Sequence, residues 1–254
     1  MTCSFFVTPL QLYGGTEANR EQSTRVASYE VKVRKPSDSI LKGRALSEEL
    51  LSCEYPQRPI DPASIHREIC VVTNQLVISG DLPSNYGAKF DQLDKWVDAG
   101  ITDVIDVREE RDDSEFIRSN SDITPYWLGV DDCGSRRDPA WFMNLTAITE
   151  SILADSQRKL LIHCHMGVNR GPSAAFAALI HHGWHHLDAL RAIRRARPIA
   201  GIIYAPDAAE WHGLHSTGCP TTALEWREDV EAWLDRHPLD LRWVISSIGR
   251  RTAA

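Results

Sequence analysis

Cys164 and Arg170 are the residues of this chain whose types and spacing point most directly to chemistry. They lie in the segment LLIHCHMGVNRGPS, residues 160–173, with five residues between them. A deprotonated cysteine is a nucleophile, and a planar guanidinium can donate two parallel hydrogen bonds to phosphate oxygens. Gly167, between them, permits a tight turn and a close approach of the backbone to an anion. This combination is typical of a site that binds and cleaves a phosphate ester.

The sequence around these residues predicts a strand, a loop and a helix. Leu160–Ile162 is an apolar strand that ends at His163 and Cys164, and Pro172 marks the start of a helix that extends to Gly183. Backbone N–H groups at a helix N-terminus attract anions, and the helix dipole adds positive potential there. We therefore expect an oxyanion cradle with Cys164 at its start.

The pattern His-Cys-x-x-Gly-x-x-Arg resembles the signature loop of cysteine-based phosphatases of the tyrosine and dual-specificity class. The resemblance covers roughly residues 70–205 and is strongest to the compact dual-specificity branch. It implies Cys164 as nucleophile and Arg170 as phosphate ligand. It also implies a phosphate-binding loop of His165, Met166, Gly167, Val168, Asn169 and Arg170, supported by His163, Gly171 and Ser173.

The same resemblance implies a general acid, because the leaving oxygen must gain a proton. In this family the acid is an aspartate just beyond the strand that precedes the helix before the signature loop. Here that strand is residues 126–130, followed by two aspartates. The usual spacing places the acid on Asp132, and Asp131 is the alternative.

Position 171 departs from the family pattern. The family usually has serine or threonine directly after the arginine, and its hydroxyl is thought to help the sulfur leave the phosphoenzyme. This chain has Gly171, with Ser173 as a possible substitute two residues later. The departure predicts that hydrolysis of the phosphocysteine limits turnover.

The elements that must position this loop form an alternating pattern of strands and helices. Apolar strands at 75–79, 103–107, 126–130 and 160–162 alternate with amphipathic helices, which predicts an α/β fold with a central, largely parallel sheet flanked by helices. The resemblance adds that this is the three-layer fold of dual-specificity phosphatases. We expect a catalytic domain over 66–205, an N-terminal extension over 1–65 with one strand near 27–33, and a C-terminal helical extension over 206–254.

Composition narrows the class of protein and its partners. The formal charge of −7 argues against a general nucleic-acid binder. Six cysteines without a C-x-x-C pair argue against a zinc knuckle or a disulfide scaffold. Neither a signal peptide nor a membrane-spanning run is apparent. We expect a cytoplasmic protein with no membrane association, no metal and no cofactor.

The expected function is hydrolysis of phosphomonoesters, by default phosphotyrosine, phosphoserine or phosphothreonine in proteins. The loop contains no lysine, which argues against a polyphosphorylated lipid. Asn169, the residue before the arginine, keeps an RNA 5′-phosphatase open. A slow phosphate-binding module, or pseudophosphatase, is a further alternative. DVIDVRE at 103–109 also resembles rhodanese-type sulfurtransferases, but five residues between Cys164 and Arg170 fit phosphate better.

Two further groups of residues are interpreted as structural. The basic run of Arg191, Arg194, Arg195 and Arg197 indicates a solvated helix face, with a substrate patch as the alternative. The histidines at 181, 182, 185 and 186 indicate a solvated helix end rather than a metal site.

Overall fold

The structure is a computed structural model that describes residues 60–252. The strand expected near residues 27–33 lies outside the described residues. Within residues 60–252, the longest apolar helices remain too short or too polar to span a bilayer.

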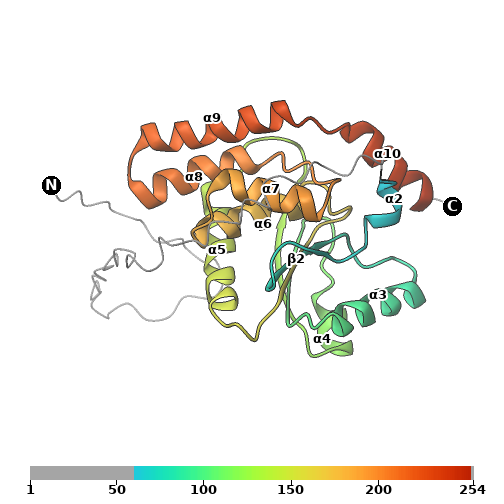
Figure 1. Cartoon of the computed structure of the whole chain (residues 1–254). Coiled ribbons are helices and arrows are strands. Elements are labelled where there is room, and N and C mark those ends of the chain that lie inside the picture. The colour runs from blue at the N-terminus through green and yellow to red at the C-terminus, as the bar shows by residue number, and fades with distance from the viewer. Residues whose placement is uncertain (1–59, 253–254) are drawn as a thin grey trace, which may run out of the picture. The chain divides into compact units, whose positions relative to one another are not determined.

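A five-stranded sheet organises the described residues (Figure 1). The strands lie in the order β1-β2-β5-β3-β4, with β1 antiparallel to β2 and the other pairs parallel. Their bounds are Cys70–Val71 for β1, Leu76–Ser79 for β2, Asp103–Arg108 for β3, Thr124–Val130 for β4 and Leu160–His163 for β5. The predicted α/β class with a largely parallel sheet is confirmed. Because four strands are parallel, their carboxyl ends share one edge, where α/β proteins usually bind ligands.

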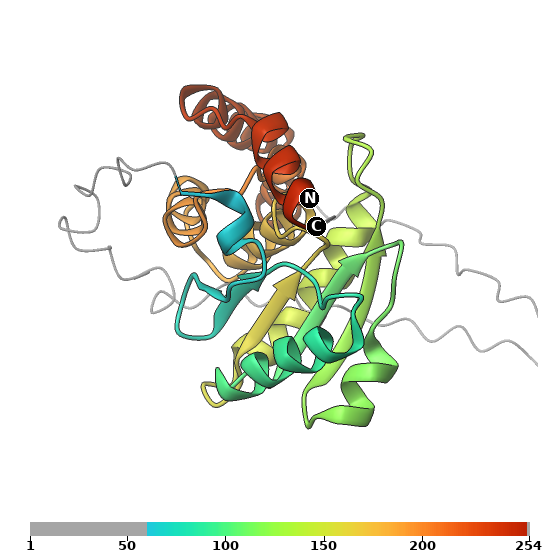
Figure 2. The same cartoon turned by 90° about the vertical axis from the view of Figure 1, so that its right-hand side faces the viewer.

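Helices cover both faces of the sheet and give three layers (Figure 2). On one face α3 (Tyr86–Asp98) and α4 (Ser114–Asn120) bury Trp96 and Ile117 against strand residues such as Val104. On the other face α5 (Pro139–Leu153) and α6 (Arg170–His181) pack against the sheet, with Leu145 and Phe176 fully buried, and α7 (His186–Ala196) packs against α6. Burial of these apolar side chains is the main contribution to stability.

The helices begin and end at residues with an identifiable local cause. Asp138 accepts a hydrogen bond from the backbone N–H of Ala140 and caps α5, as its Asp-Pro sequence predicts. Gly183, after α6, has a φ of 86°, a conformation that glycine adopts without strain. On α3, Lys89 and Gln92 are buried, whereas the apolar Val97 is 46% exposed.

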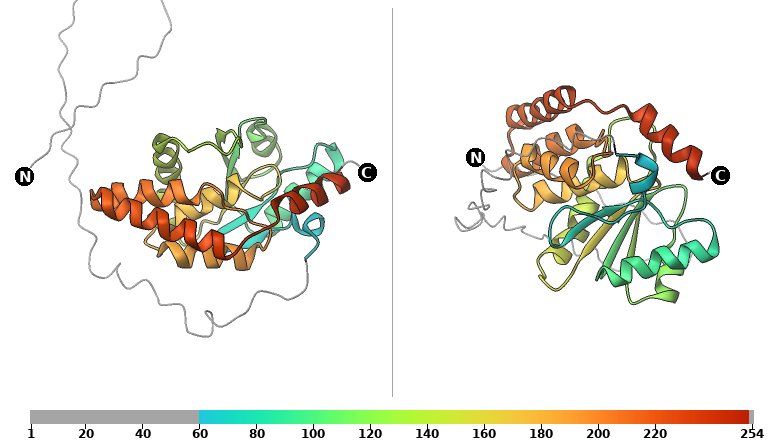
Figure 3. Two further views of the ribbon diagram at one scale, coloured as in Figure 1. Left: turned by 90° about the horizontal axis from the view of Figure 1, so that it is seen from above. Right: turned by 45° about the vertical axis from the view of Figure 1, so that its right-hand side comes forward.

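Three helices follow α7, where the sequence predicts a helical extension over 206–254. They are α8 (Ala205–Thr217), α9 (Pro220–Arg236) and α10 (Leu241–Thr252). Helix α8 packs between α6 and α9, and α10 lies beside the short helix α2 (Pro62–Ile65) (Figure 3). The domain boundaries near residues 65 and 205 remain predictions.

The basic run in and after α7 is only partly solvated. Arg194 is 5% exposed and Arg197 is completely buried, so the solvated face predicted for these two residues is wrong. The histidine prediction is wrong for His186, which is buried against Trp226 with 5.4 Å between ring centroids.

Candidate active site

The loop between β5 and α6 starts at Cys164 and ends at Arg170, as the sequence predicts. Four consecutive carbonyl oxygens of this loop accept hydrogen bonds from outside it. They are His165 O from Asp81 N (3.0 Å), Met166 O from Arg197 Nη2 (3.1 Å), Gly167 O from Arg197 Nε (2.5 Å) and Val168 O from Gly201 N (2.6 Å). Because a trans peptide directs its N–H opposite to its C=O, the N–H groups of residues 166–169 point into the loop. The result is an anion cradle built from backbone.

Gly167 is required by the close packing outside this loop. Its φ is +63°, and a Cβ there would lie 2.3 Å from Arg197 Nη2 and 2.7 Å from Ser79 O. The backbone turn and the contact with Arg197 therefore both exclude a side chain.

Arg197 is a buried positive charge directly behind the cradle. Besides the two loop carbonyls, it donates to the carbonyl oxygens of Ile65, His66 and Glu68 and to Cys70 Sγ. Among the described residues, no carboxylate forms an ion pair with Arg197. The positive charge of this guanidinium adds positive potential inside the loop.

Cys164 lies at the bottom of the cradle and is 2% exposed. It follows β5 and precedes the N-terminus of α6, so the helix dipole is directed at this position. The neighbouring His163 is fully buried on the other face of the sheet, against Trp96 at 5.2 Å between ring centroids. Burial lowers the pKa of His163 and keeps the imidazole neutral.

Arg170 uses one edge of its guanidinium inside the protein. Nη1 and Nη2 donate to the two carboxylate oxygens of Glu110 at 2.6 and 2.7 Å, and Nη1 also donates to Val130 O at 3.0 Å. The Arg170 hydrogen bond lowers the pKa of Glu110 to about 2. The buried Nε has no hydrogen-bond partner among the described residues. Nε and Nη2 form an edge of the guanidinium with the geometry that phosphate oxygens need.

Asp132 lies at this edge. Its Oδ2 is 3.4 Å from Arg170 Nε, and its Oδ1 accepts hydrogen bonds from Asn169 Nδ2 at 2.6 Å and Tyr204 OH at 2.9 Å. Asp131 is directed elsewhere: it accepts from Cys133 N and pairs with Arg137. These bonds, first those from Cys133, lower the pKa of Asp131. Of the two aspartates, only Asp132 contacts Arg170.

Gly171 and Ser173, the other supporting residues, face the base of the loop. A Cβ on Gly171 would lie 3.2 Å from Cys164 N. Ser173 is fully buried, and its hydroxyl contacts Asn169 Oδ1 and accepts from Tyr204 N. The Ser173 hydroxyl is therefore hydrogen-bonded to these two residues.

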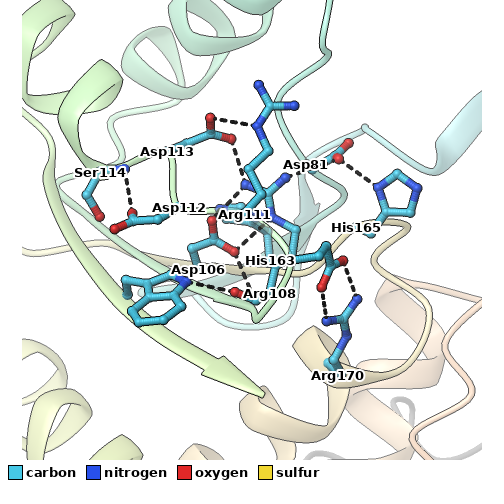
Figure 4. A network of polar contacts seen from close by, with 12 residues as sticks. Asp81, Asp106, Arg108, Arg111, Asp112, Asp113, Ser114, His163, His165 and Arg170 are labelled. Carbon is cyan, nitrogen blue, oxygen red and sulfur yellow. Dashed lines mark hydrogen bonds and ion pairs between the residues drawn. The ribbon is translucent and has the colours of Figure 1, made fainter. Parts of the chain in front are cut away.

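A buried ionic network supports the loop from β2 and β3 (Figure 4). Arg108 is 1% exposed and pairs with Asp81, Asp106 and Asp113. Burial opposes its charge, but the hydrogen bonds to Asp106 and Asp113 raise the pKa of Arg108. Asp81 Oδ2 is also 2.7 Å from Nδ1 of His165, so the network holds the first residue of the loop after Cys164.

Three residues of the site escaped the sequence analysis, Asp81, Glu110 and Tyr204, and the role of Arg197 behind the loop was not predicted. Asp81 and Glu110 follow β2 and β3, which both pair with β5. Because parallel strands end at one edge, the strand order would have indicated them. No signal in the sequence marks Tyr204. No group of three or more potential metal ligands occurs in the described range of the chain.

Comparisons with known proteins found structural similarity only. No protein-family model matches the chain, and no curated protein matches its sequence. Tk-PTP in its active form is 20% identical, with a TM-score of 0.46 over 56% of this chain and 92% of that chain. Human DUSP28 is 15% identical, with a TM-score of 0.48 over 65% and 100% of the two chains. Kinase associated phosphatase is 17% identical, with a TM-score of 0.47 over 64% and 99%.

Proposed function

We propose that this chain is a cysteine-dependent phosphatase that hydrolyses phosphate monoesters. The observation that carries the proposal is the buried Nε of Arg170, which makes no hydrogen bond within the described residues and lies beside Asp132 at the mouth of a loop whose N–H groups point inward. A tetrahedral oxyanion would satisfy both sets of donors at once. Cys164 at the bottom of the loop would then lie behind the phosphorus atom.

Two chemical steps follow from this arrangement. First, the Cys164 thiolate forms a bond to phosphorus, the ester P–O bond breaks, and Asp132 gives its proton to the leaving oxygen. Second, water attacks phosphorus, Asp132 takes a proton from it, and the S–P bond breaks to release phosphate and the thiolate. Arg170 and the loop N–H groups stabilise the equatorial oxygens in both transition states.

We propose a phosphorylated protein as the substrate. The residues between Cys164 and Arg170 include no lysine that could meet additional phosphates. Asn169, which kept an RNA 5′-phosphatase open, has a different explanation here: its side chain donates to Asp132 and accepts from Ile203 N at 2.7 Å. Its presence therefore gives no specific support to an RNA substrate.

The proposal is tested with para-nitrophenyl phosphate on wild type, Cys164→Ser and Cys133→Ser. Cys164→Ser should lose turnover by a factor of at least about 10³, because an alcohol at this position lacks the nucleophilicity of a thiolate, while vanadate binding is retained. Cys133→Ser is the matched control, since Cys133 is an exposed free cysteine, and should keep its activity. Residual turnover in Cys164→Ser within tenfold of wild type would contradict the assignment.

A further inference from the structure

Tyr204 connects the aspartate loop to the anion cradle, although it belongs to neither. It directly precedes α8 and is 1% exposed. Its hydroxyl donates to Asp132 Oδ1 at 2.9 Å and accepts from Gly134 N at 3.1 Å. The Arg137 guanidinium lies over its ring, 4.3 Å from the centroid. One buried phenol therefore contacts three residues of the loop that carries Asp132.

The backbone around Tyr204 is fixed to the start of α6. Tyr204 N donates to Ser173 Oγ at 3.2 Å, and Ile203 N donates to Asn169 Oδ1 at 2.7 Å. The preceding Ile202 has a φ of 57°, which is rare for a β-branched residue and strains the backbone. Ile202 is fully buried in the core, and this packing holds the strained conformation in place. The backbone at Tyr204 is therefore fixed by hydrogen bonds to Asn169 and Ser173, while the Tyr204 hydroxyl bonds to Asp132.

These contacts distinguish the two oxygens of Asp132. Oδ1 accepts from both Asn169 and Tyr204, so its lone pairs are engaged. Oδ2 makes the longer contact, 3.4 Å to Nε of Arg170, the guanidinium proposed to bind the phosphate. Burial, together with the Asp132 charge, raises the pKa of Tyr204, so the phenol remains a donor at neutral pH.

We propose that Tyr204 is the positioning residue for the general acid: its hydroxyl fixes Asp132 so that Oδ2 carries the proton and delivers it to the leaving group. This inference rests on the proposed phosphatase function. Tyr204 touches no reacting atom, so its removal should impair protonation of the leaving group and leave nucleophilic attack nearly intact.

The test compares Tyr204→Phe with wild type on two esters. Phenyl phosphate has a poor leaving group and needs the acid, whereas para-nitrophenyl phosphate needs little protonation. We expect kcat on phenyl phosphate to fall by about 10- to 100-fold, and on para-nitrophenyl phosphate by less than about threefold. Tyr86→Phe is the matched control, because Tyr86 is 70% exposed, and should behave as wild type.

A double variant separates positioning from a general effect on the fold. In Asp132→Asn the proton donor is absent, so adding Tyr204→Phe should cost no further rate on phenyl phosphate. Additive losses, an equal loss on both esters, or no selective loss in Tyr204→Phe would overturn the inference. If Tyr204→Phe does not fold, Ser173→Ala removes the anchor of the Tyr204 backbone and should show the same selective loss; a non-selective result there overturns the inference as well.

The outcome for wild type distinguishes this inference from the proposed function. A wild-type protein that hydrolyses neither ester overturns the proposed function, and the role of Tyr204 with it. A wild-type protein that hydrolyses both esters, with a Tyr204→Phe variant that shows the wild-type ratio of the two rates, overturns only the role of Tyr204.

Discussion

At position 171 the close packing of the loop favours glycine, whereas the expected chemistry favours a residue with a hydroxyl group. A hydroxyl here could donate to the departing sulfur of a phosphocysteine, and a hydrogen bond to a charged group contributes roughly 1.5–3 kcal/mol. Glycine has no such donor, and the Ser173 hydroxyl is engaged by Asn169 and Tyr204. The backbone of Gly171 has ordinary helical geometry, yet a Cβ would crowd Cys164 N and the carbonyl carbon of His163, both at 3.2 Å.

Two substitutions at this position separate crowding from chemistry. Gly171→Ala adds only the Cβ, and Gly171→Ser adds the same Cβ with a hydroxyl. We expect kcat of the serine variant to exceed that of the alanine variant by about tenfold, the rate equivalent of about 1.4 kcal/mol. Stopped-flow kinetics should show a product burst in wild type and in Gly171→Ala that shrinks in Gly171→Ser. Equal rates and equal bursts in the two variants would show that water already serves the leaving sulfur.

At the scale of elements, α6, α8 and α9 meet around a cluster of histidines and tryptophans. His212 of α8 lies 5.6 Å from Trp226 and 6.0 Å from His181, measured between ring centroids. Burial, reinforced by His181 and His215, lowers the pKa of His212 from 6.5 to about 4. Burial also lowers the pKa of His181, His182 and His186.

This cluster predicts that acid destabilises the protein. Between pH 6.5 and 4 the unfolded chain binds protons that folded His212 does not, so stability falls as the pH falls through this window. After allowance for solvent screening, the loss from His212 is about 1–2 kcal/mol. The melting temperature of His212→Gln should depend less on pH between 7 and 5 than that of wild type. His185→Gln, at an exposed position that is not among the causes of the His212 pKa shift, is the control; a wild-type slope in His212→Gln would contradict the prediction.

The elements that the sequence predicted have either a one-sided apolar pattern or a continuous apolar run. Strands β2, β3, β4 and β5 and helices α3, α5, α6, α7 and α9 were all expected. Helix α8 was missed because neighbours cover it on several sides, and its alanines, Pro206 and Gly213 are buried without periodicity. Helix α4 has seven residues and β1 has two, too few for a pattern to show.

The residues of the candidate site also fall into those that the sequence could predict and those that it could not. Cys164, Gly167 and Arg170 could be predicted because their chemistry depends on spacing within one short segment. Arg197 and Tyr204 could not, because their contacts with the loop and with Asp132 join residues 30 and 72 positions apart. Such contacts exist only after the helices have packed.

At the scale of the whole described chain, both of its ends support the loop. Arg197 ties the carbonyl oxygens of Ile65 and Glu68 to the loop from one side. From the other side α10 contributes Val244 and Ile248 to a cluster with Val168 and Ile199. The apolar side of the loop is therefore covered by the last described helix.

Substitutions in α10 should consequently weaken anion binding by the cradle. Val244 is fully buried, and Val244→Ala should lower the free energy of unfolding by about 1–3 kcal/mol. It should also weaken vanadate binding measured by calorimetry, because Val168 loses a packing partner. The adjacent Ile245 is 48% exposed, and Ile245→Ala is the matched control. Equal vanadate affinity in both variants would show that the loop does not depend on α10.

The Nε–Nη2 edge of Arg170 has a consequence for the protein inside a cell. The cradle meets only the oxygens of a phosphate group, and those oxygens are the same in the ester and in the inorganic phosphate that its cleavage releases. A cradle that binds the phosphate group of the ester therefore also binds inorganic phosphate, and contacts to phosphate oxygens alone do not distinguish the two. Discrimination must come from groups outside the loop that meet the rest of the substrate. Under the proposed function, the protein is expected to hold inorganic phosphate until such a substrate arrives, and its rate depends on the ratio of substrate to free phosphate around it.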